Sequence, residues 1–559
     1  MRLRGNPFPT NELALAGTGP GAATQRSSMS TTAVRPSRMA LLNPAISGPL
    51  FYKEMKHRES RKQFGALLLG KMIGVSLAIA VGMAVVWYFG AQAHAQDAAA
   101  AAPPPPDVIN PLNTVWVLVT AFLVFFMQAG FMGLEAGFAR ERESVNIMLE
   151  CIVDTCLCGL LFFAFGFAFM FGEGNGLIGY NYFFLNTDTA TYGTTGIAFM
   201  AFFLFQFAFA DTASTITSGA MVGRTGFKGD LIYSIFVSGF IYPIIGHWIW
   251  GPGGWLATMD TPFRDFAGST VVHTVGGMVA LTGAIALGPR LGRKFKRDGG
   301  GMWPGHDMII AAIGAVILWF GWYGFNPGST LSAMDFEGIG RVAANTTLAA
   351  AAGGLVALFF VYPRSKKWDT GMTINGFLGG LVAITAPCYW VSPAGAIIIG
   401  AIAGIIVPLA VDFIEWLRVD DPIGAVAVHG FCGIWGTISI GLLAAGLYGV
   451  PGPSGADTTT VVTGLFYGGG TKQLITQLIG SAVCTVVALA AGFAVMYFTK
   501  LTGTLRVSEE GELEGLDIHE HGAPAYHFEL GSGGYSLPTA GSSTSSGKSS
   551  SKKSQSELV

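Results

Sequence analysis

Two aspartate–histidine pairs in apolar sequence are the residues of this chain whose types and spacing could do chemistry. In Asp265-Phe-Ala-Gly-Ser-Thr-Val-Val-His273 the histidine follows the aspartate by eight residues, and Asp421-Pro-Ile-Gly-Ala-Val-Ala-Val-His429 repeats this spacing. In a helix, the spacing would put both side chains roughly on one face, about 12 Å apart along the axis. Ionisable groups inside a membrane span are costly and point to function. Their repetition predicts a duplicated transporter fold with its pathway near the midplane.

Two histidines in contact would have a defined chemistry. A neutral imidazole has one donor and one acceptor nitrogen, so a pair shares one N–H and each ring keeps one nitrogen for a passing molecule. Such a pair titrates as a unit and can line a path for a small polar solute or relay a proton. Zinc is the alternative, with Cys432 near His429, but no second thiolate is evident nearby. We expect no metal and no cofactor.

The elements that must position these side chains are membrane-spanning helices. The chain has 559 residues, of which 51% are hydrophobic and 12% charged, about half the usual charged fraction of soluble domains. This composition predicts an all-α polytopic membrane protein, and the net charge of -2 argues against a nucleic-acid partner. The six cysteines lie in apolar runs without CxxC spacing, which indicates small buried hydrophobes.

Eleven apolar runs of spanning length begin at Leu112. They cover approximately residues 112–138, 146–172, 195–219, 229–250, 267–289, 305–325, 341–362, 372–391, 394–416, 424–447 and 472–499. Lys and Arg gather in the loops of one side, which is therefore cytoplasmic, with the mature N-terminus outside and the C-terminus inside. Because each half has five spans, an odd number, the second half is inverted. This five-plus-five repeat would bring His273 and His429 together, and the eleventh span has no counterpart.

The regions that flank the spans divide the chain further. We expect a leader with a signal peptide over 1–95, cleaved after Ala93-His-Ala95, with a start at Met39 or Met55, or an uncleaved anchor, as alternatives. The remaining boundaries are an external Ala/Pro-rich spacer at 96–111, a membrane domain at 112–500, a cytoplasmic regulatory tail at 501–530 and a disordered Ser/Gly-rich tail at 531–559.

Aromatic side chains occur near the outer ends of several spans. Phe205 and Phe209 are four residues apart on one helical face, Trp250 ends the fourth apolar run, and Phe325 lies near Ser329 after the sixth. Ordinary packing or an aromatic belt at the membrane surface is one interpretation. The other is a vestibule above the histidines that attracts a small cation by cation–π contact, with the serine hydroxyl as a hydrogen-bond acceptor.

Several motifs of this chain carry a resemblance to a known family. They are Phe125-Phe-Met-Gln-Ala-Gly-Phe131, Leu134-Glu-Ala-Gly137, Phe205-Gln-Phe-Ala-Phe209-Ala210, the segment from Asp265 to His273, Gly321-Trp-Tyr-Gly-Phe-Asn-Pro-Gly-Ser329, Asp420-Asp-Pro422 with Val428-His-Gly-Phe-Cys-Gly-Ile-Trp-Gly436, and the tail from Leu505 to Tyr526. Over about residues 110–527 the chain resembles the ammonium transporter (Amt/Mep/Rh) family, and its bacterial Amt branch in particular.

The resemblance implies an ammonium transporter fold of eleven helices, a homotrimer with one pore per subunit, and a place in the cytoplasmic (inner) membrane. It implies transport of ammonium or ammonia, with a PII-type signalling protein as partner at the cytoplasmic face. It assigns substrate recruitment to Phe209, Trp250 and Ser329, the phenylalanine gate to Phe209 and Phe325, the pore to His273 and His429, and a structural and electrostatic role to Asp265 and Asp421.

The chain departs from the family pattern in two places. Val222-Gly-Arg224 stands where the family often has Ala-Glu-Arg, so this loop is expected to couple differently to the tail. Asp211 lies within a span, where it could pair in the bundle or alter the field felt by a cation. Two alternatives stay open: an ammonium sensor that signals through its tail, and an Rh-like gas channel. No nucleophile–base set appears in the sequence, so we do not expect an enzyme.

Overall fold

The computed structural model describes residues 108–526; the predicted leader and the Ser/Gly-rich tail lie outside the described residues. In chain order the membrane helices and π-helical turns are α3 (Ile109–Phe125), α4 (Met127–Phe138), α5 (Ser144–Leu161), η3 (Phe162–Gly166), α6 (Phe167–Phe171), α7 (Phe199–Gly219), α8 (Phe227–Phe236), η5 (Val237–Ile241), α9 (Tyr242–Trp250), η6 (Ser269–Thr274), α10 (Val275–Leu287), α11 (Met308–Gly328), α12 (Phe336–Ser365), α13 (Thr370–Thr385), α14 (Pro393–Trp416), η8 (Val426–Phe431), α15 (Cys432–Leu443) and α16 (Lys472–Leu501).

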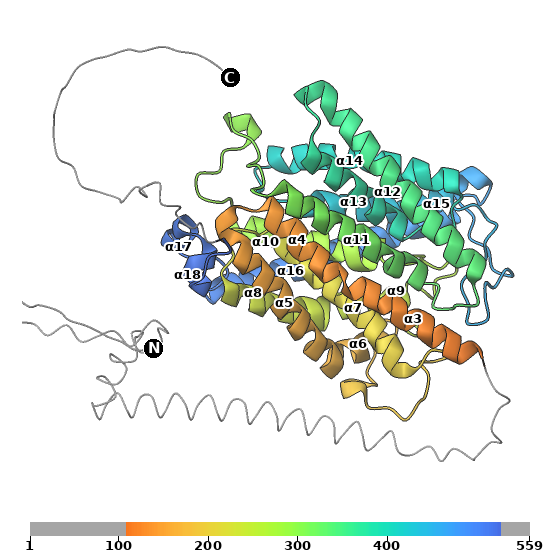
Figure 1. The fold of residues 1–559 in the computed structure, drawn as a ribbon. Coiled ribbons are helices and arrows are strands. Elements are labelled where there is room, and N and C mark those ends of the chain that lie inside the picture. Colours follow the sequence, from red (N-terminus) through yellow and green to blue (C-terminus); the bar gives the residue numbers. More distant parts are fainter. Residues whose placement is uncertain (1–107, 527–559) are drawn as a thin grey trace, which may run out of the picture. The chain divides into compact units, whose positions relative to one another are not determined.

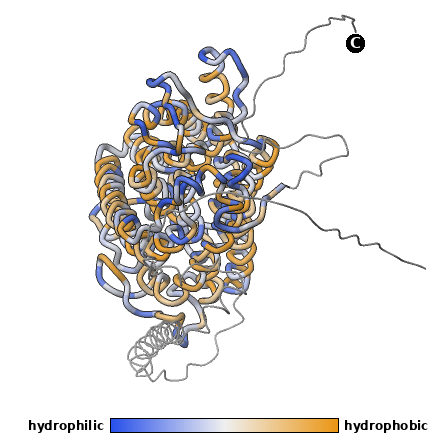
Figure 2. The backbone as a smooth tube through the Cα atoms, turned by 90° about the vertical axis from the view of Figure 1, so that its left-hand side faces the viewer, coloured by the Kyte–Doolittle hydropathy of each residue, from blue (hydrophilic) through white to orange (hydrophobic). Residues whose placement is uncertain are grey.

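These elements build the predicted all-helical membrane fold. Within residues 108–526, ten helical segments are long and apolar enough to cross a membrane, and the shorter helix α13 occupies the place of the remaining predicted span. Figure 1 shows α3 and α4 running beside α11 in a bundle of long helices. Hydrophobic residues continue along the outer helices in Figure 2, and many large apolar side chains are exposed there, as expected for contact with lipid.

The eighth span is helical over a shorter stretch than the sequence predicts. We expected residues 372–391, but α13 ends at Thr385, two residues before Pro387, which cannot continue a helix. Residues 386–391 go on as irregular buried backbone, and the Asn345 amide donates to the carbonyls of Cys388 and Val391. Non-helical backbone is tolerated at membrane depth where protein surrounds it.

The two halves meet through equivalent elements. Helices α3 and α4 of the first span pack on α11 of the sixth, and η6 and α10 of the fifth pack on η8 and α15 of the tenth. A Cβ atom on Gly433, four residues after His429, would lie 2.5 Å from Thr274 Oγ1. On the other side Gly277, four residues after His273, meets the backbone of Gly430 in the same way. Small residues thus let the histidine-bearing spans cross at close range.

Both of these spans begin with a π-helical turn that an aspartate caps. The Asp265 carboxylate accepts hydrogen bonds of 2.8–2.9 Å from the N–H groups of Gly268, Ser269, Thr270 and Val271. The Asp421 carboxylate accepts bonds of 2.9–3.1 Å from Gly424, Ala425 and Val426. The expectation that Asp and His share a helical face is therefore wrong. Each Asp precedes its helix, because glycines with φ of 117° and 83° (Gly268 and Gly424) turn the chain before the helix begins.

The tail forms two short helices, α17 (Glu509–Glu514) and α18 (Leu516–His521), at the end of the bundle that carries the basic loops (Figure 1). Arg506 pairs with the buried Glu512, whose other oxygen accepts the N–H of Leu291. The backbone N–H of Asn146 donates to Asp517 at 3.0 Å. The tail is thereby attached to loops from both halves of the membrane domain.

Candidate functional site

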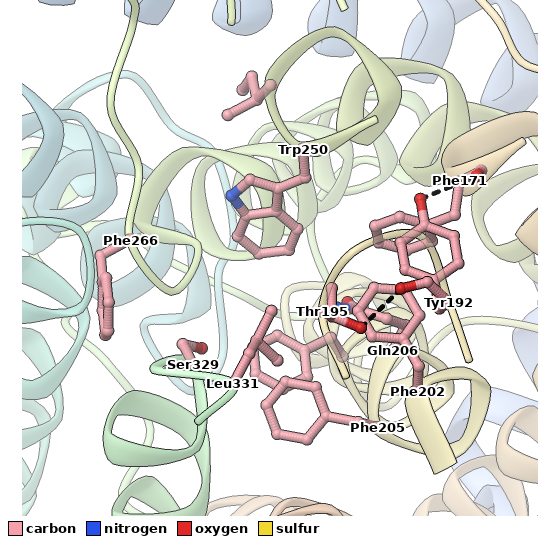
Figure 3. Close-up of a pocket in the computed structure, with 12 residues that line it drawn as sticks. Phe171, Tyr192, Thr195, Phe202, Phe205, Gln206, Trp250, Phe266, Ser329 and Leu331 are labelled. Atoms are coloured by element: carbon pink, nitrogen blue, oxygen red, sulfur yellow. Dashed lines mark hydrogen bonds between the residues drawn. The ribbon is translucent and has the colours of Figure 1, made fainter. Parts of the chain in front are cut away.

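A cavity of ≈ 320 Å³ opens above the point where the two halves cross (Figure 3). Its walls are Phe171, Tyr192, Thr195, Phe202, Phe205, Gln206, Phe209, Ile249, Trp250, Phe266, Ser329 and Leu331. The three residues assigned to recruitment from the sequence, Phe209, Trp250 and Ser329, all line it. Because α7, α9 and the end of α11 contribute one each, distant parts of the chain form this vestibule together.

The polar groups of the vestibule favour a ligand that donates hydrogen bonds. The Trp250 indole N–H is already used, since it donates to the Asp265 carbonyl at 2.7 Å. The Ser329 hydroxyl donates to the Phe325 carbonyl at 2.9 Å, which leaves its oxygen free to accept. The buried Gln206 side-chain oxygen also has no partner. Aromatic faces together with acceptor oxygens suit a small cation with N–H groups.

Two stacked phenylalanines close the floor of the vestibule. The ring centroids of Phe209 and Phe325 are 4.1 Å apart with an interplanar angle of 28°. Both side chains are at most 1% exposed. Trp250 lies above them, edge-on to Phe209 with centroids 6.1 Å apart. The stacked rings lie between the vestibule and His273, whose ring centroid is 5.5 Å from that of Phe325.

The two predicted histidines are in direct contact beneath the phenylalanines. The Nδ1 atoms of His273 and His429 are 3.1 Å apart, so one of them carries a hydrogen and the other accepts it. The His273 ring lies 5.5 Å from Phe325 and stacks on Trp322 at 5.3 Å. His273 Nε2 is buried without a protein partner. The pair therefore keeps one buried ring nitrogen, His273 Nε2, that no protein group uses.

A sequence profile of the Ammonium Transporter Family matches residues 115–526, which include the whole vestibule, gate and histidine pair. The chain belongs to the ammonium transporter family. It is 45% identical over 426 residues to ammonium transporter Amt2 of Archaeoglobus fulgidus, covering 74% of this chain and 88% of that one. It is 38% identical over 440 residues to ammonium transporter 1 member 3 of Solanum lycopersicum, covering 75% and 94%.

Solved structures of ammonium transporters share the fold. A structure described as a sensor Amt protein is 38% identical and superposes with a TM-score of 0.67 over 74% of this chain and 99% of that one. Mep2 of Candida albicans is 27% identical, with a TM-score of 0.65 over 72% and 87%. The chain is therefore an ammonium transporter, with ammonium or ammonia as its substrate.

Two departures from the family pattern have a structural account in this transporter. Gly223 adopts φ 82°, and a Cβ there would lie 2.5 Å from the carboxylate of Glu143. A carboxylate from another loop thus fills the space beside Gly223, where the family often has Glu. Arg224 is buried and donates to the carbonyls of Gly288 and Asp420. The loop joins both halves of the transporter at the end of the bundle that holds the tail.

Asp211 does not line the vestibule. Its carboxylate accepts a hydrogen bond of 3.0 Å from Thr155 on α5, so it pairs within the bundle.

Some of the ammonium transporter's site residues were not found from the sequence alone. Tyr192 lies in an irregular segment outside any apolar run, where no periodicity indicates a common cavity. Gln206, Phe266 and Trp322 lie inside motifs that the resemblance rests on, so they could have been singled out. A polar residue between two phenylalanines of an apolar run, Phe205 and Phe207, was the available signal for Gln206.

Proposed function

We propose that this transporter binds ammonium in the vestibule, passes it through the Phe209–Phe325 gate, removes a proton and conducts ammonia along His273 and His429. The histidine pair relays the proton separately, so that one positive charge crosses the membrane for each ammonium ion. The observation that carries the proposal is the continuous order of these groups. Successive ring centroids are 6.1 Å apart from Trp250 to Phe209, 4.1 Å to Phe325, 5.5 Å to His273 and 5.2 Å to His429.

The physical reason for deprotonation is the dryness of the path. Phe209, Phe325 and His273 are all at most 1% exposed, and moving a charge through such surroundings costs about 3 to more than 10 kcal/mol. Neutral ammonia avoids this cost and can hydrogen-bond to the imidazole nitrogens. Potassium resembles ammonium in charge but cannot lose a proton, so the same step separates the two ions.

We assign a positioning role to Asp265 and Asp421. Asp265 accepts four backbone N–H groups with its carboxylate and the Trp250 indole N–H with its carbonyl oxygen. It therefore orients the vestibule tryptophan and the start of the His273 span together. Asp421 accepts backbone bonds in the corresponding place before the His429 span. The negative charge of Asp265 also favours a cation at the vestibule, whereas Asp421 lies at the opposite end of the bundle, beside the basic loops.

The proposal includes the cellular setting. We assign the chain to the cytoplasmic membrane as a homotrimer, with a cleaved leader, the mature N-terminus outside and the tail inside. Support for the orientation comes from the loops that hold the tail, which carry Arg140, Arg142, Arg224, Lys228 and Arg290. We assign the tail a regulatory role with a PII-type signalling protein, since it contacts loops from both halves of the transporter.

A sensor function is the second candidate, because one structural relative is described as a sensor Amt protein. Currents on a supported membrane distinguish the two. Purified full-length protein in liposomes is given equal pulses of ammonium and of potassium. Transport predicts a current with ammonium and none with potassium, whereas a sensor would show only the brief binding signal that does not depend on liposome size. Trp250→Leu should raise the ammonium concentration for half-maximal current, and equal half-maximal concentrations would contradict the assignment of the vestibule.

A further inference from the structure

Five carboxyl groups lie buried between α4, α5, α7 and α8, apart from the vestibule and the histidines. They belong to Glu135, Glu150, Asp154, Asp211 and Asp230, none of which is more than 4% exposed. Within residues 108–526, no Lys or Arg forms an ion pair with any of them. Unpaired buried carboxylates cost several kcal/mol each, so groups in such surroundings tend to hold a proton instead.

The contact between Asp154 and Asp230 indicates where a proton resides. Asp154 on α5 and Asp230 on α8 belong to helices that pack on each other, and their carboxyl groups interact. Both oxygens of Asp154 and Oδ2 of Asp230 are buried without a hydrogen bond from the backbone or from a neutral side chain. Asp230 Oδ1 accepts the Tyr233 hydroxyl hydrogen, whereas its Oδ2 has no other partner. Two carboxyl groups can hydrogen-bond to each other only when one of them is protonated.

A serine beside the pair is a second and independent indication of a binding site. Ser234 is 0% exposed, and its hydroxyl lies next to Asp154 across the α5–α8 contact without a well-formed hydrogen bond to it. A buried donor without a partner is uncommon. It is suited to bond to the Asp154 carboxylate when the proton has left. The site can therefore exist with and without its proton.

The cytoplasmic end of this region is covered by the tail. Glu150 lies one turn before Asp154 on α5 and accepts a hydrogen bond of 2.9 Å from Asn146, a further turn before it. His521 of α18 bonds to the Asn146 side-chain oxygen at 2.9 Å, with Phe227 of α8 against its ring. Burial lowers the pKa of His521, although the nearby Glu520 and Asp517 oppose this. His521 and Phe227 therefore cover Asn146 and the acidic residues beyond it.

A proton suits this region better than a metal ion. Among the side chains of residues 108–526, no group of three or more His, Cys, Asp or Glu is arranged to hold a metal. At the far end, Asp211 bonds to Thr155, the residue next to Asp154, and lies two residues from the gate residue Phe209. The acidic residues therefore extend from the depth of the gate to the tail.

We propose that Asp154 and Asp230 form a proton-binding site inside the helix bundle, separate from the histidine pair, and that this site exchanges its proton with the cytoplasm beneath α18. The proposal does not depend on the route taken by ammonia. It gives the transporter a buried proton that equilibrates with the cytoplasm at the tail.

Infrared spectroscopy of the full-length protein in lipid reads the proton directly. The wild type should show the C=O stretch of a protonated carboxylic acid at neutral pH. Asp154→Asn and Asp230→Asn should each reduce this band, whereas the exposed control Asp298→Asn should leave it unchanged. Bands of equal size in all four proteins would overturn the site.

Exchange into D2O tests the connection to the cytoplasm in proteins that keep both aspartates, so it does not depend on the folding of the variants above. The band should shift on exchange, and several-fold faster in His521→Ala than in the wild type, because the cover over Asn146 is weakened. His519→Ala, a change on the more exposed face of α18, is the matched control and should exchange at the wild-type rate. Equal rates in the two histidine variants would overturn the assigned route.

Discussion

Gly277 touches Gly430 backbone to backbone, and a Cβ atom on Gly277 would overlap the Gly430 nitrogen. Gly277 follows His273 by four residues, and Gly430 follows His429 directly. The crossing of the two inverted halves and the 3.1 Å contact between His273 and His429 are therefore set at one place. A change in the spacing of the backbones there must move the imidazoles apart.

Gly277→Ala should destabilise the protein by about 1–3 kcal/mol, as expected for overpacking, and should reduce the ammonium current. Thermal unfolding in detergent and currents on a supported membrane measure the two effects. Gly340→Ala is the control, since a Cβ there meets nothing within 4 Å, and alanine is the better helix former. If Gly277→Ala keeps the stability and the current of the wild type, the two spans can move apart at this crossing without loss of function.

Glu143 should be more important for stability than its neighbour Glu141. Its buried carboxylate pairs with Arg140, accepts that residue's N–H at 3.1 Å and fills the space beside Gly223. Glu143→Ala removes these bonds and leaves a cavity, which should cost about 3 kcal/mol. Glu141→Ala alters an exposed side chain and should change stability by less than about 0.5 kcal/mol. Unfolding temperatures of the two variants measure these effects. A similar decrease in both variants would contradict the stabilising role of the buried Glu143 carboxylate.

Asp420 should make the free energy of unfolding depend on pH. Burial opposes its ionisation, but hydrogen bonds from Arg290 and the charge of Arg224 outweigh this and hold the pKa of Asp420 below its usual range. The ionised Asp420 carboxylate therefore stabilises the folded protein fully above the pKa of Asp in the unfolded chain, about 4. This stabilisation is lost as the pH falls through the pKa of Asp420 in the folded protein.

Unfolding of Asp420→Asn and of the wild type across pH tests this. The variant should be less stable than the wild type by about 3 kcal/mol at pH 7. This difference in unfolding free energy should become smaller below about pH 4. Asp298→Asn removes a largely exposed partner of Arg418 and should differ little from the wild type at any pH. A difference between Asp420→Asn and the wild type that stays constant with pH would mean that the variant loses packing contacts rather than a charge interaction.

The tail should detach when Glu512 loses its charge. Glu512 is 1% exposed and holds Arg506 and the N–H of Leu291. In Glu512→Gln the amide keeps the shape but not the charge, so amides of residues 505–521 should exchange hydrogen several-fold faster. Glu510→Gln, an exposed change in the same helix, should leave exchange unchanged. Protection in Glu512→Gln equal to that of the wild type would contradict the tail attachment.

The fold was largely predictable because apolar length and the repeated Asp–His spacing are strong signals in a membrane chain. Two predictions, the length of the eighth helix and the common helical face of Asp and His, were wrong for local reasons. Pro387 shortens α13, and the glycines at 268 and 424 release each aspartate from the helix that it was expected to share with a histidine. The end of α13 and the turns at the two glycines depend on backbone conformation, which the length of an apolar run does not indicate.

The candidate site was predictable where a motif carries it and not elsewhere. His273, His429 and Phe325 lie in motifs, whereas Tyr192 reaches the vestibule from a connection with no recurring pattern. The contact of Asp154 with Asp230 joins two helices at positions that a single sequence cannot pair.

The measurement that bears most directly on the central claim compares His273→Leu with His273→Asp in reconstituted vesicles. The claim is that neutral ammonia, after loss of a proton, passes the histidine pair. Leucine keeps an apolar wall without ring nitrogens, so the ammonium flux should fall at least about tenfold, the effect of roughly 1.4 kcal/mol on a barrier, with no potassium flux. Aspartate places a carboxylate in the dry path, where a cation can neutralise it, so potassium should begin to pass. Wild-type ammonium flux without potassium flux in both variants would contradict the account.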